Sequence, residues 1–168
     1  MTYLDNIMYV VCYKSSTIRL YNTDTRSRLR VVINVKGMKD PCDIVVCRHD
    51  RQLYVADNYC IWRVSVDDHS YVKWLTQLPT DRFHVYTLSV TSRRLLVTSS
   101  WPSRTVRQYS TTNKELLCVL HLSQYMKELY HAVETTHNTI VISHRGTSQD
   151  EEQYAVSELF RFRHVLQH

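Results

Sequence analysis

The stretch Pro41–Val66, PCDIVVCRHDRQLYVADNYCIWRVSV, decides the fold. It contains three short runs of strand-forming residues, Asp43–Cys47, Gln52–Asp57 and Cys60–Val66, and turn-type residues separate them. The runs either alternate apolar and polar side chains or are short and apolar throughout. None carries the i, i+3, i+4 apolar stripe of a helix. The stretch therefore predicts consecutive strands joined by tight turns.

The shape of this stretch recurs before and after it. Three sets of residues repeat at spacings of 42 to 45: Ile44, Leu88 and Val133 in first strands, Met8, Leu53, Leu95 and Ile140 in second strands, and Arg19, Arg63 and Arg107 in third strands. Four strands in each such period, with turns between them, are typical of a β-propeller blade. The chain is therefore predicted to be a repeat protein.

We predict an all-β fold, a β-propeller of four-stranded antiparallel blades, in a single domain over residues 1–168. The blade parts lie at about 1–35, 41–78, 86–122 and 130–168, which makes about three and a half blades. Few propellers have fewer than four blades, and an open arc exposes apolar faces at its ends. We expect an incomplete arc of three to four blades, a fragment of a longer propeller, whose edges are covered by further blades or by self-association.

Composition bears on the partners, the cysteine redox state and the cellular compartment of the protein. The net charge of +5 and the pI of about 9.0 permit a nucleic-acid partner but do not require one, because the charges are scattered. The cysteine count is odd, at five, and no CxxC occurs, which favours reduced thiols in strands. The first residues do not form a signal peptide, and no apolar run reaches the ~20 residues that span a membrane. We expect a cytoplasmic protein.

The residues from Gly37 to Val66 carry a resemblance to a known family. A glycine and a proline precede an apolar strand, an apolar–Tyr–Val–Ala–Asp strand and an Ile/Arg/Val strand; the matching residues are Gly37, Pro41, Ile44, Leu53, Tyr54, Val55, Ala56, Asp57, Ile61, Arg63 and Val64. This pattern resembles the NHL repeat. The other cycles depart from it, with Thr98-Ser99 and Ser143-His144 in place of the Ala-Asp pair. The resemblance implies a six-bladed propeller that serves as a binding platform, often for protein and sometimes for RNA.

Propellers bind on their rims. Loops that join fourth to first strands and second to third strands lie on one rim, and the candidate binding residues there are Lys14, Lys36, Lys39, Tyr59, Arg82, His84, Trp101, Arg104, Tyr125, Lys127 and Arg145. Basic residues interleaved with aromatic ones suit RNA, which needs phosphate neutralisation and base stacking. Acidic residues on the same rim offset much of that charge: Asp40, Asp81, Glu128, Asp150, Glu151 and Glu152. An ordinary solvated rim explains the composition as well.

Other conspicuous residues have structural explanations. The recurring arginines are expected to lay their stems across adjacent strands with their charged heads in water. Asp57 is expected to cap the backbone N–H groups of the turn around Asn58. One NHL-like class is a zinc-dependent lyase, and His84, His131 and His144 are the residues that could approach the corresponding face. No HExxH, CxxC or GxSxG motif supports such chemistry.

These observations favour a non-catalytic binding scaffold for a protein partner, without a cofactor or metal. RNA binding by the same scaffold is the alternative, and a zinc-dependent lyase is a remote one. The family's modules often end ubiquitin-ligase chains, but this chain carries no Cys/His zinc spacing and no heptads, so ligase activity is not assigned to it.

Overall fold

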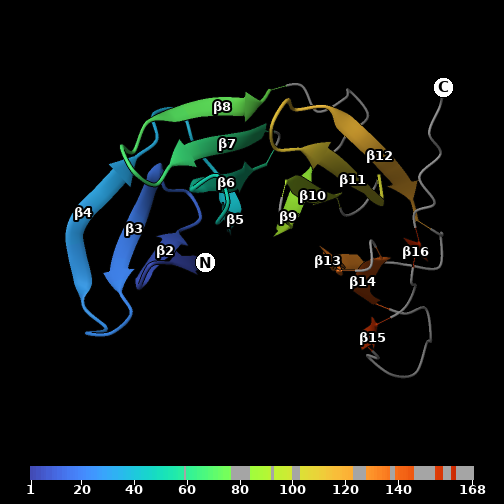
Figure 1. Cartoon of the computed structure of the whole chain (residues 1–168), viewed down its shortest axis with the longest axis horizontal. Helices are drawn as coiled ribbons and strands as arrows, with labels where there is room; N and C mark the ends of the chain where they lie inside the picture. The colour runs from blue at the N-terminus through green and yellow to red at the C-terminus, as the bar shows by residue number, and fades with distance from the viewer. Residues whose placement is uncertain are drawn as a thin grey trace.

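The computed structural model describes residues 1–58, 60–76, 84–91, 93–99, 103–122, 128–136, 139–145, 154–156 and 160–161. They form four antiparallel sheets of four strands each, every sheet one blade of a β-propeller. The blades follow one another in an open arc, with β5, β9 and β13 toward its concave side and β4, β8 and β12 toward its convex side (Figure 1). The prediction of an incomplete all-β propeller is confirmed.

The strands begin and end close to their predicted bounds. Blade 1 contains β1 (Thr2–Leu4), β2 (Ile7–Val11), β3 (Thr17–Asn22) and β4 (Arg28–Asn34). Blade 2 contains β5 (Pro41–Cys47), β6 (Gln52–Asp57), β7 (Cys60–Ser65) and β8 (Tyr71–Leu75). Blade 3 contains β9 (Val85–Thr91), β10 (Arg94–Ser99), β11 (Thr105–Ser110) and β12 (Leu116–His121).

Blade 4 is described only in part. It contains β13 (Glu128–Glu134), β14 (Thr139–Arg145), β15 (Tyr154–Val156) and β16 (Phe160–Arg161), and both β15 and β16 pair with β14. The strand expected over 162–166 lies outside the described residues. Throughout the described part of the chain, no helix is long and apolar enough to cross a membrane.

Tight turns connect the strands where the sequence supplies residues that tolerate a left-handed backbone. Asp5 and Asn6, between β1 and β2, both have positive φ, at 49° and 59°. Two consecutive positive φ values define the primed turn that matches the twist of a hairpin, and Asp and Asn adopt them at low cost. Asn58, directly after β6, also has a positive φ, of 48°.

Two of the predicted register equivalences are wrong by one residue. Arg19 and Arg107 pair with Val10 and Val97, each two residues beyond the recurring apolar residue of the second strand. The corresponding residue of blade 2, Val55, pairs with Trp62, whereas Arg63 pairs with Tyr54 and therefore lies on the other face of its sheet. In the first strands the residue that matches Leu88 is Ala132, because Ala132 pairs with Ile142 as Leu88 pairs with Val97. Val133 is the next residue and is 39% exposed. The second-strand set, Met8, Leu53, Leu95 and Ile140, is confirmed: each is the second residue of its strand.

The core lies between blades rather than inside one of them. Leu53 and Val55 pack with residues of blade 1, and Tyr54 and Ala56, next to them in β6, pack with residues of blade 3. Leu96 begins a third cluster shared with blade 4. Because side chains alternate along a strand, each blade presents one apolar face to the blade before it and another to the blade after it.

The first face of blade 1 has no such neighbour among the described residues. It consists of Met8, Val10, Arg19, Tyr21 and Val32, which pair across β2 to β4 and point away from blade 2, and of Tyr3, which pairs with Met8 and whose ring at the edge of this face also meets Arg48 of blade 2. We call it the open face of blade 1. Tyr3 is 61% exposed and Val32 is 38% exposed. An open propeller arc is expected to expose such a face.

Candidate functional site: the loop rim and the concave groove

Backbone hydrogen bonds fix the loops of the predicted rim. Val35, just after β4, donates to the carbonyl of Ser16 at 2.8 Å, and Leu122, just after β12, donates to that of Arg104 at 3.1 Å. At blade 2, Val85 donates to the carbonyl of Asn58 at 2.8 Å. In each case a loop between second and third strands is tied to the connection leading into the next blade. We call this surface the loop rim.

The described candidate residues differ in exposure. Lys14, Lys36 and Lys39 are exposed on the loop rim, while His84 and Arg104 are half-buried. Arg145 does not lie in a loop as expected: it is the last residue of β14, and its backbone pairs with Glu128. The remaining candidates lie outside the described residues: Tyr59, Arg82, Trp101, Tyr125 and Lys127.

The most exposed part of the loop rim lies at blade 1. Tyr13 is 70% exposed, and the ammonium group of Lys14 lies 5.4 Å from the centre of its ring. Lys14 also has a positive φ, of 58°, which turns the loop sharply outward. Lys36 follows Val35, whose N–H is bound to Ser16 of the same loop. This corner therefore presents an aromatic ring and two ammonium groups on a loop of fixed conformation.

Asp57 has a different role from the predicted one. Among the described residues, its carboxylate accepts the backbone N–H groups of Lys39 and Asp40, at 3.3 Å and 2.7 Å, and the indole N–H of Trp62 at 2.9 Å, rather than an N–H group of Asn58. Asp57 is buried, so these donors compensate for its loss of water. The carboxylate thereby fixes the loop between blades 1 and 2 and adds little negative charge to the surface of the loop rim.

All five cysteines are free thiols in the structure: Cys12, Cys42, Cys47, Cys60 and Cys118. Burial raises the pKa of the Cys60 thiol to about 11, and the adjacent Asp57 carboxylate adds to the rise. A thiol with such a pKa stays protonated near neutral pH, where it is a weak nucleophile and a weak metal ligand.

The arginines in the third strands do not all keep their heads in water. Arg107 is only 8% exposed and lies at the junction of blades 2 and 3 with Tyr109. Trp74 lies edge-on to both Tyr54 and Tyr109 there, with ring centres 5.1 Å and 6.1 Å apart. Burial raises the pKa of Tyr54 to about 12, while the charge of Arg63 opposes the rise. Arg63 and Arg107 therefore belong to an interblade junction, and Arg107 departs from the prediction.

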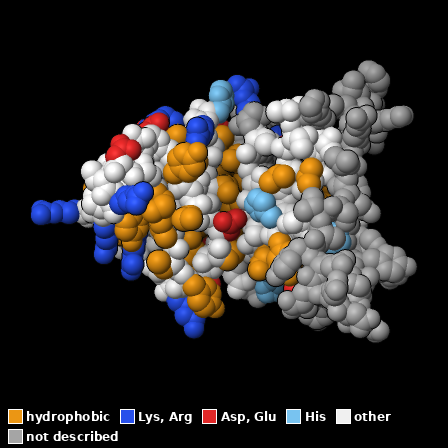
Figure 2. Space-filling model, turned by 90° about the horizontal axis from the view of Figure 1, so that it is seen from below, with side chains coloured by type: hydrophobic (Ala, Val, Ile, Leu, Met, Phe, Trp, Pro, Cys, Tyr) orange, Lys and Arg blue, Asp and Glu red, His pale blue; other side chains and the backbone are white. Residues whose placement is uncertain are grey.

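A surface that the sequence did not reveal lies on the concave side of the arc. It is a groove in two adjoining parts, with cavity volumes of about 400 Å³ and 340 Å³, and Val46, Arg48 and Val90 line both. We call it the concave groove. Its larger part is lined by residues from β1, β5, β9 and β13, the first strands of all four blades. Figure 2 looks into the concave side and shows apolar side chains there, with acidic and histidine side chains among them.

Metal ligation finds no support in the described part of the chain, which contains no group of three or more His, Cys, Asp or Glu placed to hold an ion. His84 shares a hydrogen bond with the side chain of Asn58, at 2.9 Å, and His131 lines the concave groove. His144 is buried in β14. These three histidines are not brought together as the lyase alternative requires.

The comparison with solved structures supports the propeller fold. No family model matches the sequence, and no curated protein matches it either. Among solved structures 578 chains match, including the crystal structure of the RRP9 WD40 repeats, with a TM-score of 0.59 and 14% identity. The matched region covers 84% of this chain and 42% of that one, so the chain spans less than half the length of this propeller. The chain is a β-propeller arc; the likeness extends to the fold alone.

Proposed function

We propose that this chain is a non-catalytic binding scaffold that recognises a protein partner through its loop rim. The observation that carries the proposal is the exposed set of Tyr13, Lys14, Lys36 and Lys39 on loops that backbone hydrogen bonds hold in place. Loops on a rigid scaffold bind with little loss of conformational entropy. Of the acidic residues described nearby, Asp57 is buried and satisfied, and Asp40 is half-buried. The surface therefore suits an acidic partner.

RNA remains the alternative partner of the same rim. Its chemical support is the pairing of an exposed tyrosine with a lysine, which could stack a base and neutralise a phosphate. One such pair is described, whereas single-strand binding uses several aromatic platforms, so protein is the better-supported class. RNA binding requires an affinity that falls steeply with salt.

The test is a set of three substitutions, Lys14→Glu, Lys36→Glu and Lys39→Glu, made together. Proteins captured from a cell lysate by the wild-type chain should be lost with this variant, because like charges then face an acidic partner. Arg26→Glu, Arg28→Glu and Arg30→Glu, exposed on β4 and the turn before it, form the control with the same change in net charge. Equal capture by all three proteins would refute the proposal, and fluorescence polarisation with short RNAs at two salt concentrations separates the RNA alternative.

We also propose that the chain is related to the NHL propellers and works in a reducing, cytoplasmic setting. The Gly37 to Val64 pattern supports the relationship: Gly37 has a φ of 98° and lies 3.3 Å from the Trp62 ring, measured from where a Cβ atom would stand. Only glycine adopts this conformation readily at such a close approach. The free thiols support the setting. Flanking genomic sequence with the same pattern in further blades tests the first proposal, and fluorescence microscopy of the tagged chain tests the second.

A further inference from the structure

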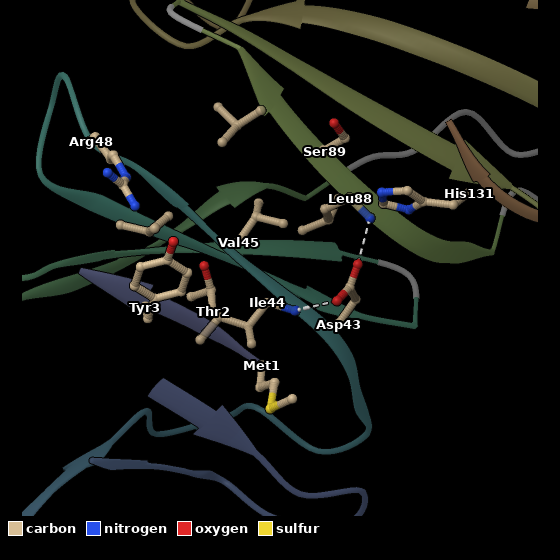
Figure 3. A pocket seen from close by; sticks show the side chains of 12 residues that line it. Met1, Thr2, Tyr3, Asp43, Ile44, Val45, Arg48, Leu88, Ser89 and His131 are labelled. Carbon is tan, nitrogen blue, oxygen red and sulfur yellow. Dashed lines mark hydrogen bonds between the residues drawn. The ribbon is translucent and has the colours of Figure 1, made fainter. Parts of the chain in front are cut away.

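The two ends of the concave groove carry different charged side chains. Its floor is apolar, made by Ile44, Val45 and Val46 of β5 and by Leu88 and Val90 of β9. Asp43 and His131 lie at one end of its larger part and Arg48 lies at the other (Figure 3). His49, the residue after Arg48, lines the smaller part. The cationic end is on the side away from the loop rim, because β5 runs from the loop rim toward Arg48. The groove is therefore a surface separate from the one that carries the proposed function.

The first strands leave backbone groups directed into this groove. The N–H of Ile44 and that of Leu88 both donate to the carboxylate of Asp43, at 2.8 Å each, and so point away from the strands they pair with. In an antiparallel ladder the direction of these groups repeats every second residue. The N–H and C=O of Val46 and Val90, two residues further on, therefore face the groove as well, on regular parts of both strands. These are sheet-edge groups of the kind that pair with an added strand.

Arg48, which lines the groove, and Arg93, which contacts the groove residue His49, differ from the other arginines on that side of the molecule. Arg51 is bound to Asp5 and Asp67, and Arg94 is bound to Glu134. Arg48 instead lies over the ring of Tyr3, 5.2 Å from its centre, and Arg93 donates to the His49 ring at 3.3 Å. Within the part of the chain that the structure describes, neither Arg48 nor Arg93 forms an ion pair. The carboxylate of Asp50, two residues after Arg48, has other partners: one oxygen lies 3.8 Å from His49 and the other accepts from Thr111.

We propose that the concave groove binds an extended peptide that pairs with the inner edges of β5 and β9 and places a carboxylate between Arg48 and Arg93. Main-chain hydrogen bonds to an exposed strand edge, with pockets for alternate side chains, are an established mode of peptide recognition. The apolar floor takes the inward side chains. Two guanidinium groups without a carboxylate partner supply the complementary charge for one acidic residue. A groove bordered by two strand edges suits an extended chain, because such a chain can pair with those edges.

The experiment selects ligands for the full chain from a displayed library of random peptides of about nine residues, ~30 Å long when extended. We expect the recovered peptides to alternate apolar residues and to carry an Asp or Glu toward one end. Arg48→Gln with Arg93→Gln should weaken their binding about tenfold, since a charge-assisted hydrogen bond contributes more than a neutral one. Replacing the peptide's acidic residue by its amide should weaken binding equally, and combining both changes should add little.

Two controls separate the groove from the loop rim and from charge in general. Arg30→Gln on β4, exposed and on the convex side, should leave peptide affinity unchanged. The triple lysine variant of the loop rim should also leave peptide affinity unchanged. If peptides stop binding to that variant but still bind the Arg48 and Arg93 variant, the loop rim and not the concave groove is the peptide site. N-methylation of every second peptide amide should abolish binding when it blocks the amides that face the strand edges, and should not when it blocks the amides in between. Recovery of no peptide, recovery of peptides without an acidic residue, or tighter binding of an RNA competitor to the same arginines would each overturn the inference.

Discussion

The face that blade 3 presents to blade 2 and the open face of blade 1 occupy the same register in two repeats of the chain. In blade 3 Leu95, Val97 and Tyr109 are buried against blade 2. In blade 1 the corresponding Met8, Val10 and Tyr21 are half-buried. The two faces carry the same pattern of apolar residues, so the pattern does not decide burial. A neighbouring sheet decides it, and a propeller blade is complete only when both of its faces are covered.

The same comparison explains why Arg19 and Arg107 differ in exposure. Arg19 of the open face and Arg107 of blade 3 hold equivalent positions, yet Arg107 is buried and Arg19 is half-exposed. A long side chain with an apolar stem can serve either environment. The open face is thus built as an interblade face that lacks its neighbour among the described residues.

The largest effect is expected from removing apolar volume on the covered face. Leu95→Ala should lower the free energy of unfolding by ~2–5 kcal/mol, because the side chain is fully buried between blades. Met8→Ala, its register equivalent on the open face, should cost about 1 kcal/mol or less. Urea denaturation of both variants measures the difference. Equal losses would show that the open face is covered in solution.

Much of this arrangement could be predicted from the sequence. Strand bounds agree within a few residues in blades 1 to 3, because alternation of side chains and turn residues are local signals. The loop rim was also predictable, since strands that alternate in direction send alternate connections to the same side.

The register error at Arg63 has a physical cause. Two residues separate β6 from β7, whereas five separate β2 from β3 and β10 from β11. Arg63 is 44 residues after Arg19 in the sequence, but the two residues do not hold equivalent positions in their sheets. The concave groove could not be predicted, because it depends on how close the first strands of different blades come to one another. Arg48 is one of several arginines in turns. It differs from Arg51 and Arg94 because those two form ion pairs, which only the structure shows.

A smaller effect is expected at the polar junction of blades 1 and 2. Asp57→Asn should lower the free energy of unfolding by ~2 kcal/mol, since an amide offers one acceptor oxygen where the carboxylate serves Lys39, Asp40 and Trp62. Asp67→Asn, on the exposed surface of the same blade, should have a much smaller effect because its pairing with Arg51 is solvated. Thermal unfolding followed by circular dichroism compares the two. A loss with Asp67→Asn that matches the loss with Asp57→Asn would contradict the role given to Asp57.

The smallest effect on stability, and the sharpest test of the open face, comes from two neighbouring valines. Val32 belongs to the open face, while Val31 points to the other side of β4, and they are 38% and 47% exposed. If another sheet covers the open face, the wild-type chain should self-associate as its concentration rises. Val32→Lys should then shift it toward the monomer because an ammonium group would have to be buried, and Val31→Lys should not. Size-exclusion chromatography with light scattering measures this shift; a well-behaved wild-type monomer would show that the open face tolerates water without a partner sheet.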